Sequence, residues 1–182
     1  MKHTRLGRTG LQVSRLCLGT MTFGNQCNEE LSHAILDHSL ELGISFIDTA
    51  DVYPASGPAA VGETERIIGR WMQGRRSEVV LATKFWGPMG PNPWEMGGSR
   101  RRIRDAVDAS LQRLGTDYID LYQIHFPDRA TPLDETLEAL DDLVRQGKIL
   151  YAGCSNFPAW MLARSIGRSE ARGLARFDCV QP

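Results

Sequence analysis

The stretch that decides the fold is Ile44-Ser45-Phe46-Ile47-Asp48-Thr49-Ala50-Asp51-Val52-Tyr53. It is an apolar, β-like run that delivers an aspartate, Asp48, and a tyrosine, Tyr53, five residues later. Two later apolar runs, residues 79–84 and 118–125, end in Lys84 and His125. The carboxyl ends of parallel strands meet at one edge of a sheet, so these four side chains are predicted to share a pocket. Such a pocket can carry proton chemistry.

The segments around this stretch alternate between strand-like and helix-like patterns. The pattern predicts strands at residues 16–20, 44–50, 79–84, 118–125, 151–155 and 177–181, and helices at 29–42, 63–73, 99–114, from 131 onward, and 158–173. Strict alternation implies parallel strands joined by right-handed crossovers, which is an α/β fold. Residues 2–15 contain a glycine-rich turn between short runs and predict a β-hairpin ahead of the sheet.

Capping residues support several of the helix boundaries. Asn28 is expected to cap the helix at 29–42, and Gly43 stands where a left-handed residue commonly ends a helix. In the helix that starts near residue 131, Thr131 is expected as the cap, with Pro132 at the first helical position. Gly147 is expected to close that helix.

The composition predicts one soluble domain over residues 1–182. The chain is 42% hydrophobic with a net charge of −1, which supports a real core and argues against nucleic acid as a partner. No secretory signal is recognisable, and no apolar run reaches the roughly 20 residues that cross a bilayer, so a cytoplasmic protein without a membrane partner is expected. The four cysteines form no C-x-x-C pair, which favours free thiols and no metal site.

The four candidate side chains suggest a division of roles. A tyrosine can give a proton to a carbonyl oxygen if its pKa, near 10 when unperturbed, is lowered. An ammonium such as Lys84 favours the phenolate of Tyr53, and a carboxylate such as Asp48 holds that ammonium in place. His125 would donate a hydrogen bond to the carbonyl or help to relay the proton.

Each of these residues also has a purely structural interpretation. Asp48 and Lys84 could form an ion pair at the strand ends, and Tyr53 could be an aromatic side chain of a loop. His125 could be a core histidine bonded to a backbone carbonyl. The joint pattern favours catalysis over these separate interpretations.

Other conspicuous residues have less specific interpretations. The arginine-rich run at 100–104 begins an amphipathic helix, mostly off its apolar stripe, and is predicted to be a solvated face. Trp71 and Trp160 lie in predicted helices and are expected to pack. Trp86 and Trp94 follow Lys84 in a Gly- and Pro-rich loop, where one of them could line an apolar substrate pocket.

Over essentially its whole length the chain resembles the aldo-keto reductases. The resemblance is carried by GISFIDTA at residues 43–50 with Tyr53, by DYIDLYQIH at 117–125 with Asp128, and by GKILYAGCSNF at 147–157. These matches are long and stand in the same order as in the family.

The resemblance implies a fold, a cofactor and a reaction. The fold is a (β/α)₈ TIM barrel whose bottom is closed by the N-terminal hairpin, with NADP(H) lying across the carboxyl ends of the strands. The reaction is the NADPH-dependent reduction of an aldehyde or ketone, a small-molecule carbonyl substrate, with Tyr53 as proton donor. The residues that the resemblance assigns are the catalytic Asp48, Tyr53, Lys84 and His125 and the cofactor-binding Gly19, Thr20, Met21, Asp48, Ser155, Asn156 and Gln181.

Two departures from the family pattern are visible. A long loop at residues 54–62 replaces the short glycine-containing turn that commonly follows the catalytic tyrosine. The chain also ends at its sixth predicted strand, so about six of eight β/α units are expected, whereas a complete barrel takes about 250 residues. Six strands cannot close a barrel, and this chain by itself is expected to be poorly soluble or weakly active.

Two alternatives to a working reductase remain open. One is a regulatory module that holds the cofactor and turns over slowly, resembling the β-subunits of potassium channels. The other is an inactive fragment. Tight NADPH binding with slow turnover would favour the first, and failure to bind NADPH would favour the second.

Overall fold

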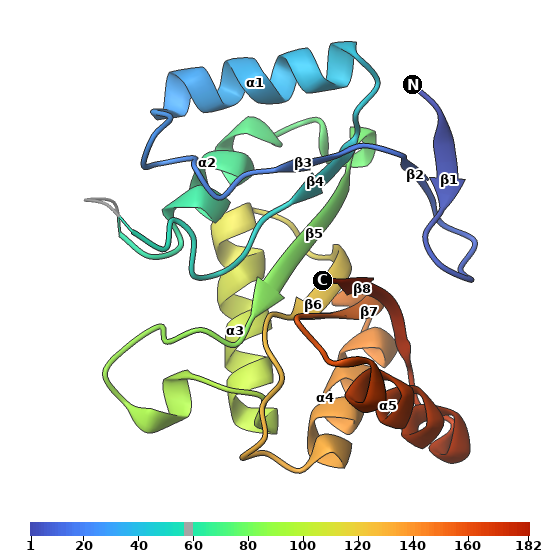
Figure 1. The fold of residues 1–182 in the computed structure, drawn as a ribbon. Coiled ribbons are helices and arrows are strands. Elements are labelled where there is room, and N and C mark those ends of the chain that lie inside the picture. The colour runs from blue at the N-terminus through green and yellow to red at the C-terminus, as the bar shows by residue number, and fades with distance from the viewer. Residues whose placement is uncertain (57–59) are drawn as a thin grey trace.

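The structure is a computed structural model that describes residues 1–56 and 60–182. Its centre is a sheet of six parallel strands that neighbour one another in chain order (Figure 1). The strands are β3 (Cys17–Gly19), β4 (Phe46–Asp48), β5 (Val80–Phe85), β6 (Ile119–Ile124), β7 (Ile149–Ser155) and β8 (Phe177–Gln181). Of the long loop predicted at 54–62, residues 57–59 lie outside the described residues.

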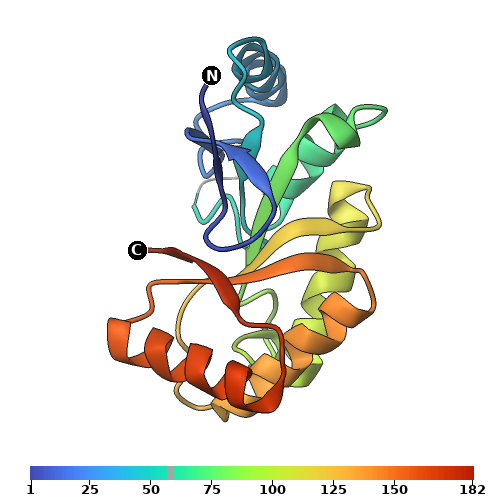
Figure 2. The same cartoon turned by 90° about the vertical axis from the view of Figure 1, so that its right-hand side faces the viewer.

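One α-helix follows each of the first five strands of this sheet. The helices are α1 (Glu29–Glu41), α2 (Glu63–Trp71), α3 (Arg100–Leu114), α4 (Leu133–Arg145) and α5 (Ala159–Arg172), and two 3₁₀ turns, η1 (Arg76–Glu78) and η2 (Pro93–Glu95), precede β5 and α3. Figure 2 shows that the sheet curls and that the helices lie on its outer side. The predicted alternation is confirmed, and the arrangement is five β/α units and a sixth strand, consistent with an incomplete (β/α)₈ barrel.

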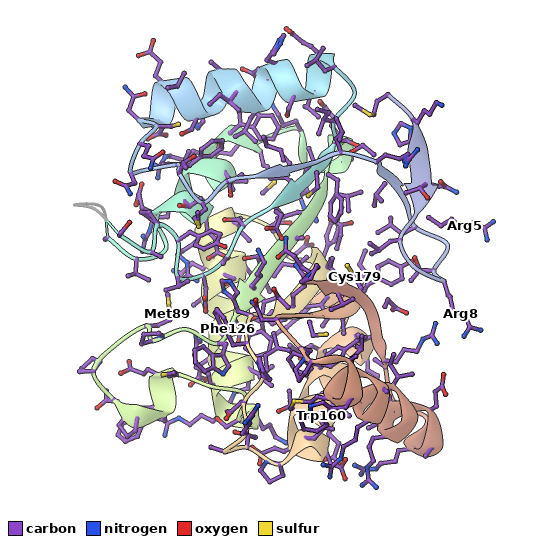
Figure 3. The ribbon with its side chains drawn as sticks, in the orientation of Figure 1. Arg5, Arg8, Met89, Phe126, Trp160 and Cys179 are labelled. Carbon is purple, nitrogen blue, oxygen red and sulfur yellow. The ribbon has the colours of Figure 1, made fainter. Side chains whose placement is uncertain are left out.

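The predicted N-terminal hairpin is present and packs against the inside of the sheet. Its antiparallel strands are β1 (His3–Arg5) and β2 (Gln12–Ser14). Leu6 and Val13 form a small buried cluster with Ala82 of β5 and Leu121 of β6. The Ser14 hydroxyl accepts a hydrogen bond of 3.1 Å from the backbone N–H of Phe46, which ties the hairpin to the start of β4. Figure 3 shows Arg5 and Arg8 on the hairpin, pointing away from the sheet.

The ends of α1 agree with the predicted caps, whereas the start of α4 does not. The Asn28 side chain accepts a 2.9 Å hydrogen bond from the N–H of Leu31, and Gly43 has the left-handed φ of +77°. In α4, however, Pro132 and not Thr131 occupies the capping position. The hydroxyl of Thr131 donates instead to Asp128 at 2.7 Å, so this residue belongs to the preceding loop.

Five of the six residues predicted for the apolar stripe of α3 are buried, and Leu111 is half-buried beside them, but the arginine-rich run is not uniformly solvated. The five buried residues are Ile103, Ala106, Val107, Ser110 and Leu114. Arg100, Arg101 and Arg104 are exposed, whereas Arg102 is 4% exposed. Arg102 lies one turn before the buried Ala106, so it falls on the face that packs against the sheet. The prediction of a solvated face is therefore wrong at this position.

The tryptophans and cysteines divide between core and surface. Trp71 is buried as predicted and donates its indole N–H to Asp37 at 2.8 Å. Trp160 is 60% exposed at the start of α5 (Figure 3), because the buried face of that helix is formed by Met161 and the two serines that follow it at helical spacing. Its predicted packing role is therefore wrong. All four cysteines are free thiols, and Cys154 is the buried one.

Candidate active site

A buried ion pair between neighbouring strands forms the base of the candidate site. In the parallel register Asp48 of β4 lies opposite Ala82 of β5, two residues before Lys84. The Lys84 ammonium donates to Asp48 Oδ2 at 2.5 Å and to the Thr49 carbonyl at 2.9 Å. Gln123 of β6 donates to the other oxygen of Asp48 at 3.2 Å. Because Lys84 is 1% exposed, these contacts compensate for the loss of water around its charge.

Tyr53 and His125 lie next to the Lys84–Asp48 ion pair. The turn after β4 brings the Tyr53 ring to 5.4 Å, centroid to Nζ, from the Lys84 ammonium. The His125 ring follows β6 and meets the Tyr53 ring edge to face, with 5.8 Å between the centroids and 81° between the planes. The structure therefore brings together all four side chains that the sequence places at the strand ends.

The phenol of Tyr53 differs from its predicted state. Burial, and next to it the Asp48 carboxylate, raise its pKa above the ordinary value. The predicted lowering by Lys84 is absent because the ammonium is paired with Asp48, which offsets its charge. The hydrogen bonds of the Lys84 ammonium go to Asp48 and to the Thr49 carbonyl rather than to the Tyr53 hydroxyl. At neutral pH Tyr53 therefore keeps its proton.

His125 is a neutral imidazole at neutral pH. Burial, reinforced by the nearby charge of Lys84, lowers the pKa of His125 to about 4, against the opposite effect of Asp48. A neutral imidazole carries one N–H donor and one acceptor nitrogen. His125 can therefore donate a hydrogen bond to an oxygen beside Tyr53, but it brings no positive charge to the site.

The ends of β7 and β8 gather three predicted cofactor residues. Ser155 lies opposite Gln181 in the register, and the N–H of Asn156 donates to the Gln181 carbonyl at 2.9 Å. The Asn156 side-chain amide donates to the His125 carbonyl at 3.0 Å and to the Ser155 hydroxyl at 3.1 Å. Among the described residues, the Gln181 amide and the Asn156 side-chain oxygen have no partner. These free donors and acceptors fit the carboxamide of a nicotinamide.

The predicted cofactor residues after β3 play different parts. Gly19 lies opposite Asp48 in the register and would meet nothing within 4 Å if it carried a Cβ. Met21 is 57% exposed, and Gly19 is exposed as well. Thr20 is buried, and its hydroxyl donates to the Asp48 carbonyl at 2.9 Å. Thr20 therefore fixes the strand ends together.

Aromatic side chains extend the site outward from His125. The His125 ring stacks on Phe126 with 4.9 Å between centroids, and Phe126 contacts Trp86 at 5.3 Å. Phe126 is 42% exposed, and Figure 3 shows it with Met89 on the side of the sheet where β5 and β6 end. Trp86 and Phe126 thus form an aromatic wall beside His125, whereas Trp94 is 46% exposed, with the Arg101 guanidinium over its ring. Which of the two tryptophans lines a substrate pocket stays a prediction.

Asp128 braces the loops beside this wall, a role that the sequence reading does not assign to it. Its carboxylate accepts hydrogen bonds from the N–H groups of Gly98 and Ala130 at 2.8 and 2.9 Å, and from Thr131. Burial alone would raise the pKa of Asp128, but these bonds lower it below its ordinary value. The available signal is Asp128 three residues before Thr131, the spacing of a side chain that bonds its own turn.

The described residues form neither a metal site nor a membrane-spanning helix. No group of three or more His, Cys, Asp or Glu side chains there is placed to hold a metal ion. Of the helices described, none combines the length and the apolar character that a membrane crossing needs.

Comparison with known proteins places the chain in a family. The profile of the Aldo/keto reductase family matches residues 15–182, and the chain belongs to this family of oxidoreductases. It is 49% identical over 180 residues to the uncharacterized oxidoreductase YrpG of Bacillus subtilis, covering 94% of this chain and 54% of YrpG. It is 40% identical over 187 residues to norsolorinic acid reductase A of Aspergillus parasiticus, covering 94% of this chain and 47% of that protein.

A third relative is the protein tas of Escherichia coli. It is 37% identical over 205 aligned residues, which include 100% of this chain and 59% of tas. The chain therefore spans about half the length of the curated relatives it matches.

Proposed function

We propose that the protein is an NADPH-dependent reductase of aldehydes or ketones, that residues 1–182 form one domain of it, and that Tyr53 is its proton donor. The observation that carries this proposal is that the Tyr53 ring contacts both His125 and the Lys84 ammonium, which is itself bonded to the buried Asp48 carboxylate. In this chemistry a bound nicotinamide dinucleotide supplies the hydride.

The chain's own groups would then manage the carbonyl oxygen. The N–H of the neutral His125 orients the oxygen, and the Tyr53 phenol gives its proton as negative charge develops there. An alkoxide is a much stronger base than a phenolate, so a phenol with a raised pKa can still donate to it. Lys84 stabilises the phenolate that is left, and Asp48 keeps Lys84 charged and in place.

Ser155, Asn156 and Gln181 would hold the nicotinamide carboxamide at the ends of β7 and β8. The exposed positions of Gly19 and Met21 would line the cofactor on the side of β3. The wall of Phe126 and Trp86 favours a substrate with an apolar or aromatic body. One relative is named as a reductase of norsolorinic acid, which agrees with a reductive activity.

The test is to measure cofactor binding and carbonyl reduction by the protein and by its Tyr53→Phe variant. NADPH and NADH are titrated separately by quenching of tryptophan fluorescence, and a panel of aliphatic and aromatic aldehydes and ketones is offered. We expect NADPH to bind both proteins equally and Tyr53→Phe to reduce turnover by about 10²- to 10⁴-fold.

The other outcomes separate the alternatives. Tight binding of NADPH by the unmodified protein with turnover as slow as that of Tyr53→Phe would support a cofactor-holding module. Absence of binding to either dinucleotide would rule out the proposal for this chain.

A further inference from the structure

A second buried ion pair lies next to the turn that carries Tyr53. Asp51 and Arg102 are bonded at 2.6 Å, and their side chains are 0% and 5% exposed. Asp51 stands two residues before Tyr53, in the turn that carries the phenol, whereas Arg102 comes from the first turn of α3. The pair therefore joins the Tyr53 turn to a helix on the outer side of the sheet.

The same guanidinium also reaches the loop that follows Lys84. One nitrogen of Arg102, Nη2, donates both to Asp51 Oδ2 at 2.6 Å and to the Gly87 carbonyl at 3.3 Å. The two segments are in tight contact, since a Cβ on Gly87 would lie 3.1 Å from the Cβ of Val52. Arg102 thus fastens the turn before Tyr53 and the loop after Lys84 to each other and to α3.

The Asp51–Arg102 pair is not explained by its contribution to folding stability alone. Asp51 Oδ1 and Arg102 Nε are buried, and neither has a hydrogen-bond partner among the described residues. Removing two charges from water is costly, and apolar side chains of similar volume commonly stabilise a core as well or better. What the charged pair adds is direction, because the planar guanidinium accepts few geometries around its partners.

The backbone hydrogen bonds of residues 51–53 show which part of the candidate site the Asp51–Arg102 pair orients. The N–H of Asp51 donates to the Lys84 carbonyl at 2.9 Å, and the N–H of Tyr53 donates to the Ala50 carbonyl at 3.1 Å. The backbone between Asp51 and Tyr53 is therefore short. It is fixed at Asp51 by the Lys84 carbonyl and by Arg102, and at Tyr53 by the N–H groups of Gly62 and Thr64, which donate to the Tyr53 carbonyl at 3.0 and 3.3 Å. A shift of the Asp51 side chain would move the Tyr53 ring relative to Lys84 and His125.

From these contacts we infer that Asp51 and Arg102 form a positioning pair that sets the place of the Tyr53 phenol over Lys84 and beside His125. The inference rests on the proposed function for its kinetic consequence, but not for its structural one. Neither residue touches the substrate in this scheme, and both act through Tyr53.

The test compares this pair with a matched pair at the opposite end of the strands. Arg76 of η1 and Asp120 of β6 are bonded at 2.6 Å with side chains 17% and 8% exposed, near the amino end of β6. The variants are Arg102→Lys, Arg102→Met and Asp51→Asn, with Arg76→Lys and Asp120→Asn as controls. The protein is labelled with ¹³C at the ring carbon that bears the tyrosine hydroxyl, and the Tyr53 signal is identified with Tyr53→Phe.

We expect the variants at Asp51 and Arg102 to shift or broaden the Tyr53 signal and to lower kcat by about 10- to 100-fold with little change in KM. Arg102→Lys should keep part of kcat because it retains the charge. The controls should lower the urea midpoint while leaving the Tyr53 signal and kcat unchanged. In a Tyr53→Phe background, Arg102→Lys should change the remaining rate by less than about twofold, because the positioned group is gone.

The inference is overturned if the Tyr53 signal and kcat respond to Arg102→Lys no more than to Arg76→Lys. If Arg102→Met does not fold, Arg102→Lys and Asp51→Asn decide the question. If the unmodified protein reduces no carbonyl compound, the proposed function fails. The Tyr53 signal still decides whether the pair positions the ring.

Discussion

The ammonium of Lys84 lies 5.4 Å from the centre of the Tyr53 ring while it is bonded to a buried carboxylate. The charge under the phenol is therefore part of a neutral pair, and the Tyr53 proton is held more firmly than an isolated ammonium would allow. This relationship separates two effects of changing Lys84, one on stability and one on proton transfer.

Replacing Lys84 with methionine should lower both stability and activity, by separable amounts. It leaves Asp48 buried without its cation, and loss of one partner of a buried pair typically removes about 3–5 kcal/mol from the free energy of unfolding. The double variant Asp48→Asn, Lys84→Met should recover most of this loss in urea unfolding, yet stay at least about 100-fold less active. A double variant that regained reduction would show that the pair serves stability alone.

His125 should make the protein less stable in acid. Its pKa is about 4 when folded and 6.5 in the reference state, so between these pH values the unfolded chain binds the extra proton. This contribution to stability is present above pH 6.5 and is lost as the pH falls towards 4. Relative to the unmodified protein, His125→Gln should therefore gain stability as the pH falls from 6.5 to 4, measured as urea midpoints. A pH-independent difference would contradict the lowered pKa.

Asp51 should act in the opposite sense. Burial, opposed by Arg102, raises the pKa of Asp51 to about 7 from 3.8, so between these values the folded protein holds a proton that the unfolded chain lacks. The stabilisation is complete below pH 3.8 and is lost as the pH rises through 7. The stability of Asp51→Asn relative to the unmodified protein should consequently improve as the pH rises from 4 to 8. A relative stability that stayed constant or fell over this range would show that Arg102 keeps Asp51 ionised in the folded protein.

Removing the Asp128 carboxylate should loosen two loops at once. Asp128→Ala leaves the N–H groups of Gly98 and Ala130 without their acceptor, at a cost of about 1–2 kcal/mol in the free energy of unfolding. Amide hydrogen exchange at Gly98 should accelerate with it. Asp105→Ala, which removes an exposed acid from α3, serves as the control and should change stability by less than about 0.5 kcal/mol. Unchanged exchange at Gly98 in Asp128→Ala would refute the bracing role.

Two substitutions of Asn156 should separate the effect of its backbone conformation from the effect of its side-chain amide. Asn156 has the left-handed φ of 60°, which glycine adopts freely and alanine does not. Asn156→Gly and Asn156→Ala both lose the hydrogen bond to the His125 carbonyl, but Asn156→Ala should be less stable than Asn156→Gly by about 1 kcal/mol. Cofactor titration of the two variants should give the same weakened affinity. A difference in affinity would assign the effect to backbone strain.

Much of the fold and of the candidate site can be predicted from the sequence because the chemistry follows strand ends. The runs that lead to Asp48, Lys84 and His125 are apolar and short, and their parallel pairing determines which side chains meet. Arg102 could not be predicted in this way. A charged run is normally solvated, and the acid that draws Arg102 inward, Asp51, lies in another segment.

The predicted start of α4 was wrong for a similar reason: a residue in another segment decides the local structure. Thr131 has the composition of a helix cap, but its hydroxyl is bonded to Asp128, which displaces the helix start by one residue. The raised pKa of Tyr53 could not be predicted from the sequence either. Residue types indicate a neighbouring ammonium, but not the burial that raises the pKa.

The register between β4, β5 and β6 has a thermodynamic consequence. Asp48, Lys84 and His125 stand on three separate strands or just beyond them, and a slip of one pairing would carry one group away from the other two. Any molecule that binds all three groups therefore recognises one alignment of the three strands and discriminates against every shifted alignment. Its binding free energy adds to that of the native pairing. Such a ligand would therefore stabilise the native register of β4, β5 and β6 while it is bound at the carboxyl ends of these strands.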